Sequence, residues 1–196
     1  MSFINKEFSR REMLRSRLLA SMPKGGIAAE IGVWEGEFSR RILEICEPKE
    51  LHLIDPWLYM PEFANTGFGN PRNEYLMEER YNRVRAAFAD DPRVIIHRST
   101  SEAALLAMAD HSLDWVYIDG NHNEPFVGRD LELCLQKVKP NGVIAGDDYN
   151  WMSEALGAPV KRAVEGVLDE LGRKAKLRLR GNQYRIGLKR GEQASA

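Results

Sequence analysis

The chain has 196 residues, of which 43% are hydrophobic and 29% are charged, and its formal net charge is -1. This length suits one domain with a sizeable core, over residues 1–196. The balanced charge gives no reason to expect nucleic acid as a partner, and no run of ~18 apolar residues predicts a membrane span. The N-terminal sequence lacks the apolar core of a signal peptide, so we expect a cytoplasmic protein.

The hydrophobic pattern predicts helices and strands in alternation. In chain order we expect a helix over 6–21, a strand over 27–33, a helix over 38–46, a strand over 51–55, a long loop from 56, a helix over 73–89, a strand over 93–99, a helix over 101–109, a strand over 115–119, a helix over 126–138, a strand over 142–146, a helix over 160–171 and a hairpin over 177–190. Arginines on the first helix (Arg10, Arg11, Arg15 and Arg17) are expected on a solvated helix face.

This alternation predicts an α/β fold. Short apolar strands joined by helices form a doubly wound, mostly parallel sheet that is covered on both faces. The C-terminal hairpin adds two antiparallel strands. In such sheets ligands bind beyond the carboxyl ends of the strands, so the residues after each strand are the candidates for function.

The first two strand ends carry signals for a nucleoside. Gly32 and Gly36 frame a tight turn into a helix, where the backbone can approach a ligand closely. The spacing is not GxGxxG, and simple helix–strand packing would also explain it. Asp55 follows the second strand, at a place where an acid can accept hydrogen bonds from a ribose diol.

The third strand end is polar. Thr100, Ser101 and Glu102 follow it, and they either reach an adenine edge or cap the next helix.

The fourth and fifth strands end in acids, Asp119 and the adjacent pair Asp147 and Asp148. If these strands are neighbours, the three carboxylates lie close together and oppose joint ionisation unless a cation compensates. Oxygen ligands suit Mg²⁺, Ca²⁺ or Mn²⁺. Helix capping and solvation are the alternative explanation. His122 lies near Asp119 and can take a proton at neutral pH, or it contacts the substrate or is structural.

These strand ends carry a resemblance to a known family. The matching segments are AEIGVWEGEFS (29–39), LHLIDPW (51–57), RSTSEA (98–103), DWVYIDGNH (114–122) and GVIAGDDY (142–149). The chain resembles the class I S-adenosylmethionine-dependent methyltransferases, which have a Rossmann-like fold. Within this class it is similar to the metal-dependent small-molecule (sugar) O-methyltransferases.

The resemblance implies roles for individual residues. The expected S-adenosylmethionine-binding residues are Glu30, Gly32, Gly36, Ser39, Asp55, Thr100, Ser101, Glu102 and Asp119. A divalent metal, Mg²⁺ for example, is expected on Asp119, Asp147 and Asp148, where it would orient a hydroxyl of the acceptor and lower its pKa. The expected catalytic residues are Asp119 and His122.

One departure from the family pattern concerns the base. Several metal-dependent relatives have a second acid where this chain has Asn121, and His122 is the candidate replacement. A non-catalytic or differently acting S-adenosylmethionine-binding domain therefore stays an alternative. Phosphoryl transfer and NAD-linked dehydrogenation are less favoured, because the first strand lacks the nucleophilic acid of the former and the glycine spacing of the latter.

The resemblance also predicts an N-terminal helix within 1–24, a core over 27–190 and an acceptor lid within 56–80. The lid carries Trp57, Tyr59 and Phe63, which suit a sugar ring, an apolar scaffold or plain packing. The expected partner is a small molecule with a hydroxyl group. The sequence does not fix the oligomeric state, although such domains often form a homo-oligomer through an N-terminal helix or the hairpin.

Overall fold

The fold is built on one seven-stranded sheet, which a computed structural model describes over residues 3–63 and 66–189. The strand order is β3-β2-β1-β4-β5-β7-β6. The strands are β1 (Ile27–Ile31), β2 (Glu50–Asp55), β3 (Val94–Arg98), β4 (Leu113–Ile118), β5 (Val138–Gly146), β6 (Ala175–Arg180) and β7 (Gln183–Leu188). The first five strands are parallel, and the hairpin β6–β7 joins β5 in antiparallel fashion. The predicted fold class, doubly wound α/β with a C-terminal antiparallel hairpin, is confirmed.

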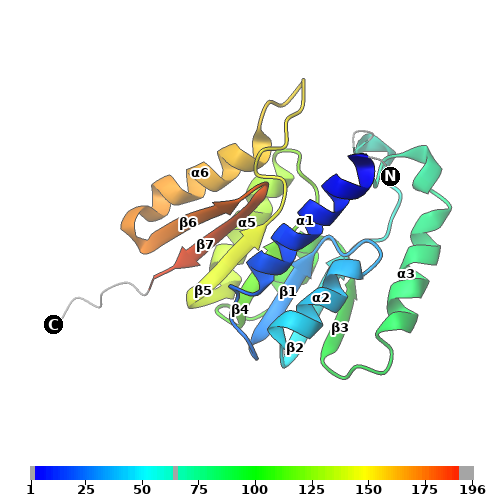
Figure 1. Ribbon diagram of the computed structural model, residues 1–196, viewed down its shortest axis with the longest axis horizontal. Coiled ribbons are helices and arrows are strands. Elements are labelled where there is room, and N and C mark those ends of the chain that lie inside the picture. Colours follow the sequence, from blue (N-terminus) through cyan, green and yellow to red (C-terminus); the bar gives the residue numbers. More distant parts are fainter. Residues whose placement is uncertain (1–2, 64–65, 190–196) are drawn as a thin grey trace.

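Helices cover both faces of this sheet (Figure 1). They are α1 (Phe3–Leu19), α2 (Glu37–Cys46), α3 (Leu76–Ala87), α4 (Ser101–Ala107), α5 (Phe126–Lys137) and α6 (Pro159–Leu171). One hydrophobic core packs α1, α2 and α3 against the sheet, and another packs α4, α5 and α6 against the opposite face. This division follows the alternation of side chains along the strands, since Ala28 belongs to one core and Ala29 to the other.

The register of the strands sets the functional edge. Ile31 of β1 pairs with Ile54 of β2 and Ile118 of β4, and Ile118 pairs with Gly146 of β5. The residues that follow these four positions therefore stand in a row along one edge of the sheet. They are Gly32, Asp55, Asp119 and Asp147.

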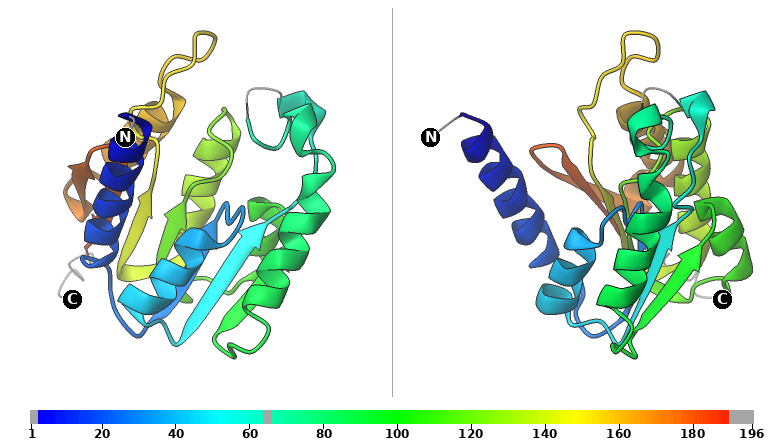
Figure 2. Two further views of the ribbon diagram at one scale, coloured as in Figure 1. Left: turned by 45° about the vertical axis from the view of Figure 1, so that its right-hand side comes forward. Right: turned by 90° about the vertical axis from the view of Figure 1, so that its right-hand side faces the viewer.

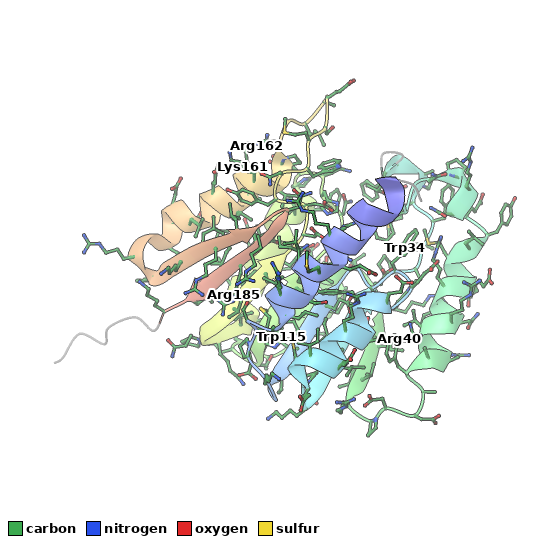
Figure 3. The ribbon with its side chains drawn as sticks, viewed as in Figure 1. Trp34, Arg40, Trp115, Lys161, Arg162 and Arg185 are labelled. Carbon is green, nitrogen blue, oxygen red and sulfur yellow. The ribbon has the colours of Figure 1, made fainter. Side chains whose placement is uncertain are left out.

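The N-terminal helix α1 lies against α2 and extends along the sheet toward the same edge (Figures 1 and 2). Leu18 and Leu19 at its end are buried in the core. Trp115 of β4, labelled in Figure 3, is fully buried and donates from Nε1 to the carbonyl of Pro23 at 3.1 Å. The chain that leaves α1 is thus tied to the middle of the sheet.

Some element boundaries differ from those expected. The third helix begins at Leu76 rather than 73, because Pro71–Asn73 forms a 3-10 turn capped by the side chain of Asn70. The fifth strand begins at Val138, although Pro140 and Gly142 suggested a turn there, because an irregularity in the β4–β5 pairing accommodates the extra residues. Within the described residues, none of the helices combines the length and apolarity that crossing a membrane needs.

Candidate active site

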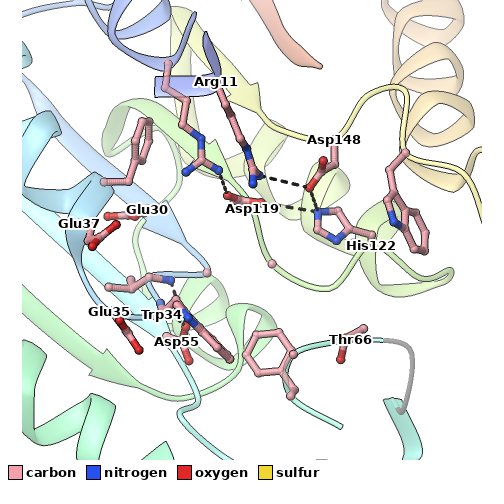
Figure 4. Close-up of a pocket in the computed structure, with 18 residues that line it drawn as sticks. Arg11, Glu30, Trp34, Glu35, Glu37, Asp55, Thr66, Asp119, His122 and Asp148 are labelled. Atoms are coloured by element: carbon pink, nitrogen blue, oxygen red, sulfur yellow. Dashed lines mark hydrogen bonds and ion pairs between the residues drawn. The ribbon is translucent and has the colours of Figure 1, made fainter. Parts of the chain in front are cut away.

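Two adjoining cavities open at the carboxyl edge of the sheet. The larger, of about 720 Å³, lies between α1 and the ends of β1, β2, β4 and β5 (Figure 4). The smaller, of about 120 Å³, has a mostly apolar wall that includes Ile31, Ile54 and Phe126. Both cavities share Gly32, Phe68 and Gly120 in their walls, so together they form one continuous site.

Gly32 holds the centre of this site. Its φ of 85° lies in the left-handed region, and its N–H donates to the carbonyl of Ile54 at 2.9 Å. A Cβ atom at this position would lie 2.1 Å from the carbonyl oxygen of Asp119. The backbone segments that follow β1 and β4 approach each other so closely that this position requires glycine.

Asp55 organises the loop after β1. Its Oδ2 accepts hydrogen bonds from the N–H groups of Val33 at 3.0 Å and Trp34 at 2.9 Å, and its Oδ1 accepts one from Trp57 at 2.8 Å. The residue is 1% exposed, and this burial raises its pKa to about 6 despite the three donors. Asp55 lines the larger cavity, but its carboxylate already holds the loop backbone, so the predicted contact with ribose hydroxyls stays a prediction.

Glu30 and Ser39 form a buried pair below the larger cavity. Ser39 Oγ hydrogen-bonds Glu30 Oε2 at 2.5 Å, and both residues are buried. Burial raises the pKa of Glu30 to about 8, so the side chain is mostly protonated at neutral pH. Gly36 adopts a φ of 75° just before α2 and packs against Phe88.

The residues after β3 separate into two environments. Thr100 caps α4, with Oγ1 accepting the N–H of Ala103 at 3.3 Å, and lines the smaller cavity together with Ser101. Glu102 instead pairs with Arg129, 2.9 Å away, on the surface. Of the two alternatives from the sequence, helix capping is found for Thr100, and the contact with an adenine edge stays a prediction.

Asp130 is a site residue that sequence reasoning missed. It lies on α5, is 3% exposed, lines the smaller cavity and accepts a hydrogen bond from Ser101. Burial raises its pKa to about 6. An acid on the otherwise apolar face of a helix was the available signal, because a buried carboxylate needs a partner.

The three predicted acids lie together at the ends of β4 and β5. His122 Nε2 lies 3.2 Å from Asp148 Oδ2 and 3.7 Å from Asp119 Oδ1 (Figure 4). Ligand atoms of Asp119, His122 and Asp148 are all within 4.8 Å of one another, close enough to hold a metal ion. Asp147, the third acid of the predicted metal set, is not among these three residues, and its Oδ2 accepts hydrogen bonds from two arginines of α1.

Arg11 and Arg15 of α1 bind these acids directly. Arg15 donates to Asp147 Oδ2 from Nε at 3.0 Å and from Nη2 at 2.6 Å, and its Nη2 also donates to Asp119. Arg11 Nη2 lies 3.0 Å from the same oxygen of Asp147. The arginines of α1 were expected on a solvated helix face, and Arg10, Arg11 and Arg17 are exposed. The expectation is wrong for Arg15, because the docking of α1 turns its side chain toward Asp119 and Asp147.

The charges of this group shift its protonation. Burial opposes ionisation of Asp147, but Arg15 and Arg11 outweigh it and lower the pKa of this carboxyl. Burial also opposes the charged form of His122, yet Asp119 and Asp148 raise the pKa of the imidazole to about 9. At neutral pH His122 is thus a cation paired with two acids, and it accepts a proton only at higher pH or after these pairs open.

The predicted lid contributes to the site through its middle part. Thr66, Gly67 and Phe68 line the larger cavity, whereas residues 64–65 and 190, which belong to the predicted lid and core, lie outside the described residues. Trp57 is 1% exposed and donates from Nε1 to the carbonyl of Trp34 at 2.8 Å, so it packs in the core. Phe63 packs edge-on against Phe126 beside the smaller cavity.

Comparisons with known proteins agree with this arrangement. A family model described as a methyltransferase domain matches residues 29–149, which is more than half of the chain and includes the carboxyl ends of the five parallel strands β1 to β5. This chain belongs to that methyltransferase family. No curated protein matches the chain.

Several solved structures share the fold of this methyltransferase, although their sequence identity to it is low. The O-methyltransferase NovP is 19% identical, with a TM-score of 0.61 over 95% of this chain and 81% of NovP. An rRNA methylase from Streptococcus thermophilus is 12% identical, with a TM-score of 0.59 over 89% of this chain and 94% of that protein. An O-methyltransferase family protein from Burkholderia thailandensis is 12% identical, with a TM-score of 0.59 over 93% of this chain and 57% of that protein. The fold is that of the class I S-adenosylmethionine-dependent methyltransferases.

Proposed function

We propose that this methyltransferase transfers the methyl group of S-adenosylmethionine to a hydroxyl group of a small molecule. The observation that carries the proposal is the pair of joined cavities at the carboxyl edge of the sheet. A narrow apolar cavity suits a planar base, and the larger cavity, lined by acids and arginines, suits a charged amino-acid group and a polar acceptor. Similarity to the O-methyltransferase NovP supports oxygen as the acceptor atom.

The residues present fit the nucleoside part of the cofactor. The smaller cavity lies between the ends of β1, β2 and β4, with Thr100 and Ser101 at its polar side. Its apolar wall provides stacking surface, and Ser101 and Asp130 provide hydrogen-bonding groups. When bound, S-adenosylmethionine supplies an electrophilic methyl group on a sulfonium.

The larger cavity fits the charged part of the cofactor and the acceptor. Asp55 and Asp119 line it and suit cationic groups, the mostly protonated Glu30 can hydrogen-bond, and the first turn of α2, which no side chain caps, suits a carboxylate. Phe68 and Trp34 meet edge to face in the wall of this cavity and give it apolar surface. These residues bind and orient the two reactants so that the acceptor oxygen approaches the methyl group in line.

The acceptor hydroxyl must lose its proton as the new bond forms. Asp119 and His122 line the same cavity and are the predicted groups for this step. Because His122 is protonated below about pH 9, a reaction that uses it as the base accelerates as pH rises toward that value.

The prediction of a divalent metal meets an obstacle in the geometry. Asp119, His122 and Asp148 are spaced to hold an ion, but Arg15 already binds Asp119. With α1 docked, the residues do not fit Mg²⁺, which requires close to six oxygen ligands.

The test is methyl transfer with labelled cofactor. The full chain is mixed with S-adenosylmethionine carrying a labelled methyl group and a panel of hydroxylated small molecules, namely sugars, catechols and phenols. Labelled product is expected from at least one of them, and binding of the cofactor is expected in calorimetry. Absence of cofactor binding would overturn the proposal.

A second candidate function is cofactor binding without turnover. It is favoured by the ion pairs that keep His122 protonated and by Asn121, whose side chain accepts the N–H of Asn123 at 3.0 Å instead of offering a carboxylate. Tight cofactor binding with no product from any acceptor across pH 7–9 would select this candidate over the first.

A further inference from the structure

The N-terminal helix brings two permanent cations to the acid cluster. Arg11 and Arg15 are four residues apart and therefore lie on the same face of α1. Both reach Oδ2 of Asp147, which is 1% exposed. A guanidinium keeps its charge at any pH that a folded protein experiences. Because the side chain is also covalently part of the protein, this cation cannot be lost to solvent as a bound metal ion can.

The arginines are held in place by the packing of α1. Leu18 and Leu19 anchor the end of the helix in the core. Arg41 of α2 binds Glu12 through a 2.9 Å ion pair, and the guanidinium of Arg15 lies 5.1 Å from the centre of the Phe38 ring. The contact between Arg15 and the acids is thus part of the docked fold.

The carboxylate oxygens of Asp119 and Asp147 are already engaged. Asp147 Oδ2 accepts from both arginines, and Asp147 Oδ1 accepts the N–H of Asp148 at 2.9 Å. One oxygen of Asp119 binds Arg15, and the other faces His122. Among the described residues, Asp119 and Asp147 therefore offer no carboxylate oxygen without a partner.

A divalent ion and Arg15 would compete for the same place. Arg15 Nη2 bridges Asp119 and Asp147, the acids that stand at the ends of two neighbouring strands. An ion held by Asp119, His122 and Asp148 would share Asp119 with this guanidinium, and the two positive charges would repel each other strongly in a partly buried site. Only one of the two can satisfy the acids at a time.

We propose that Arg15, with Arg11 beside it, is the resident cation of this acid cluster and takes the place of a divalent metal. This inference rests on the proposed methyl transfer only for its consequence that turnover needs no added metal. The cluster of Asp119, His122 and Asp148 binds a divalent ion only when Arg15 is removed. Arg15 acts as a positioning residue, which fixes the acids on which the acceptor pocket is built.

Binding of Mn²⁺ tests this directly. Free Mn²⁺ is measured by electron paramagnetic resonance in the presence of the full wild-type chain, of Arg15→Ala and of the double variant Arg11→Ala/Arg15→Ala. The wild type is expected to bind no Mn²⁺ at the cluster, and the double variant is expected to bind one ion per chain. Adding Asp148→Asn to the double variant should abolish that binding.

Matched controls separate the cluster from general effects. Arg17→Ala removes another exposed arginine of α1 and should leave Mn²⁺ binding at the wild-type level. Circular dichroism shows whether each variant is folded, and the wild-type measurement decides the question even if the variants do not fold. One Mn²⁺ per wild-type chain, lost in Asp119→Asn, would overturn the proposal, and so would a folded double variant that binds none.

Activity gives an independent reading. If an acceptor is found, wild-type turnover should be unchanged by EDTA, and a loss that Mg²⁺ restores would contradict the proposal. If no acceptor is found while the Mn²⁺ results are as expected, the proposed function fails and the assignment of the resident cation stands.

Discussion

Asp55 and Asp147 are two equally buried acids on the same edge of the sheet, each 1% exposed, and they are satisfied in opposite ways. Asp55 accepts three backbone N–H groups and its pKa is raised to about 6. Asp147 is held by Arg15 and Arg11, and its pKa is lowered. At Asp55 burial prevails over the neutral donors, whereas at Asp147 two full positive charges prevail over burial.

The two acids also differ in where their partners come from. Two of the partners of Asp55, Val33 and Trp34, are 22 and 21 residues away in the sequence. The arginines that bind Asp147 are 132 and 136 residues away. The Asp55 side of the site is therefore built from loops close in the sequence, and the Asp147 side depends on a helix that is far from it in the sequence.

The largest effect is expected from Arg15→Ala. This change leaves Asp147 buried with only the half-exposed Arg11, and breaking a buried ion pair in this way costs about 3 kcal/mol. Urea denaturation measures the free energy of unfolding. A cost comparable to that of an exposed arginine such as Arg17→Ala would show that Asp147 does not depend on Arg15.

Asp55→Asn is expected to cost somewhat less, about 2 kcal/mol, because the amide group of asparagine presents N–H groups to backbone donors that then lack an acceptor. The loop at Val33 and Trp34 should loosen, and calorimetry should show weaker cofactor binding. Asp169→Asn, on the exposed surface of α6, is the control. Unchanged stability and affinity would contradict the role of Asp55 in holding the loop.

The pH dependence of stability should have opposite signs for the two acids. The raised pKa of Asp55 means that ionisation destabilises the fold, so its contribution to stability falls as pH rises from about 4 to about 6, by at most about 1.4 kcal/mol per pH unit. The lowered pKa of Asp147 gives a contribution that is present above about pH 4 and is lost as pH falls through the folded value.

Urea denaturation at a series of pH values measures both effects. The wild-type curve minus the Asp55→Asn curve should decrease as pH rises from about 4 to about 6. The same difference for Asp147→Asn should increase as pH rises toward about 4 and stay level above it. If both stability differences changed in the same direction with pH, the backbone donors at Asp55 and the arginines at Asp147 would not have opposite effects on the pKa of the acid they bind.

The smallest effect is expected from Arg11→Ala. Its side chain is 54% exposed, and ion pairs of such residues contribute less than about 1 kcal/mol. Thermal and urea denaturation should therefore separate Arg11→Ala clearly from Arg15→Ala. Equal losses of unfolding free energy in the two variants would mean that solvent exposure does not determine how much each arginine contributes to stability.

The sequence predicted correctly those site residues whose location depends only on their position along a strand. Apolar runs located the strands, and the rule for parallel sheets brought Gly32, Asp55, Asp119 and Asp147 to one edge. The nearness of Asp119 to the β5 acids followed from the pairing of β4 with β5 alone. These features depend on periodicity and topology, which a single sequence carries.

Side-chain contacts between elements that are far apart in the sequence could not be predicted in this way. Nothing in the spacing of Arg11 and Arg15 distinguishes a helix face that docks on acids from one that faces water. Asp130 was overlooked for a similar reason, since its partner Ser101 is on another helix. Trp57 was expected with the lid aromatics, yet it packs in the core, because a loop without periodicity gives no direction for its side chains.

The long separation between the arginines and their acids has a consequence for the order of folding. On the ribosome α1 is made before β4 and β5, since Asp119 and Asp147 follow 104 and 132 residues after Arg15. Until β4 and β5 have formed, α1 has hydrophobic surface but no ionic partner, and contacts of such long range form slowly. Docking of α1 should thus be a late event, and slowing of amide hydrogen exchange in this helix would mark completion of the site.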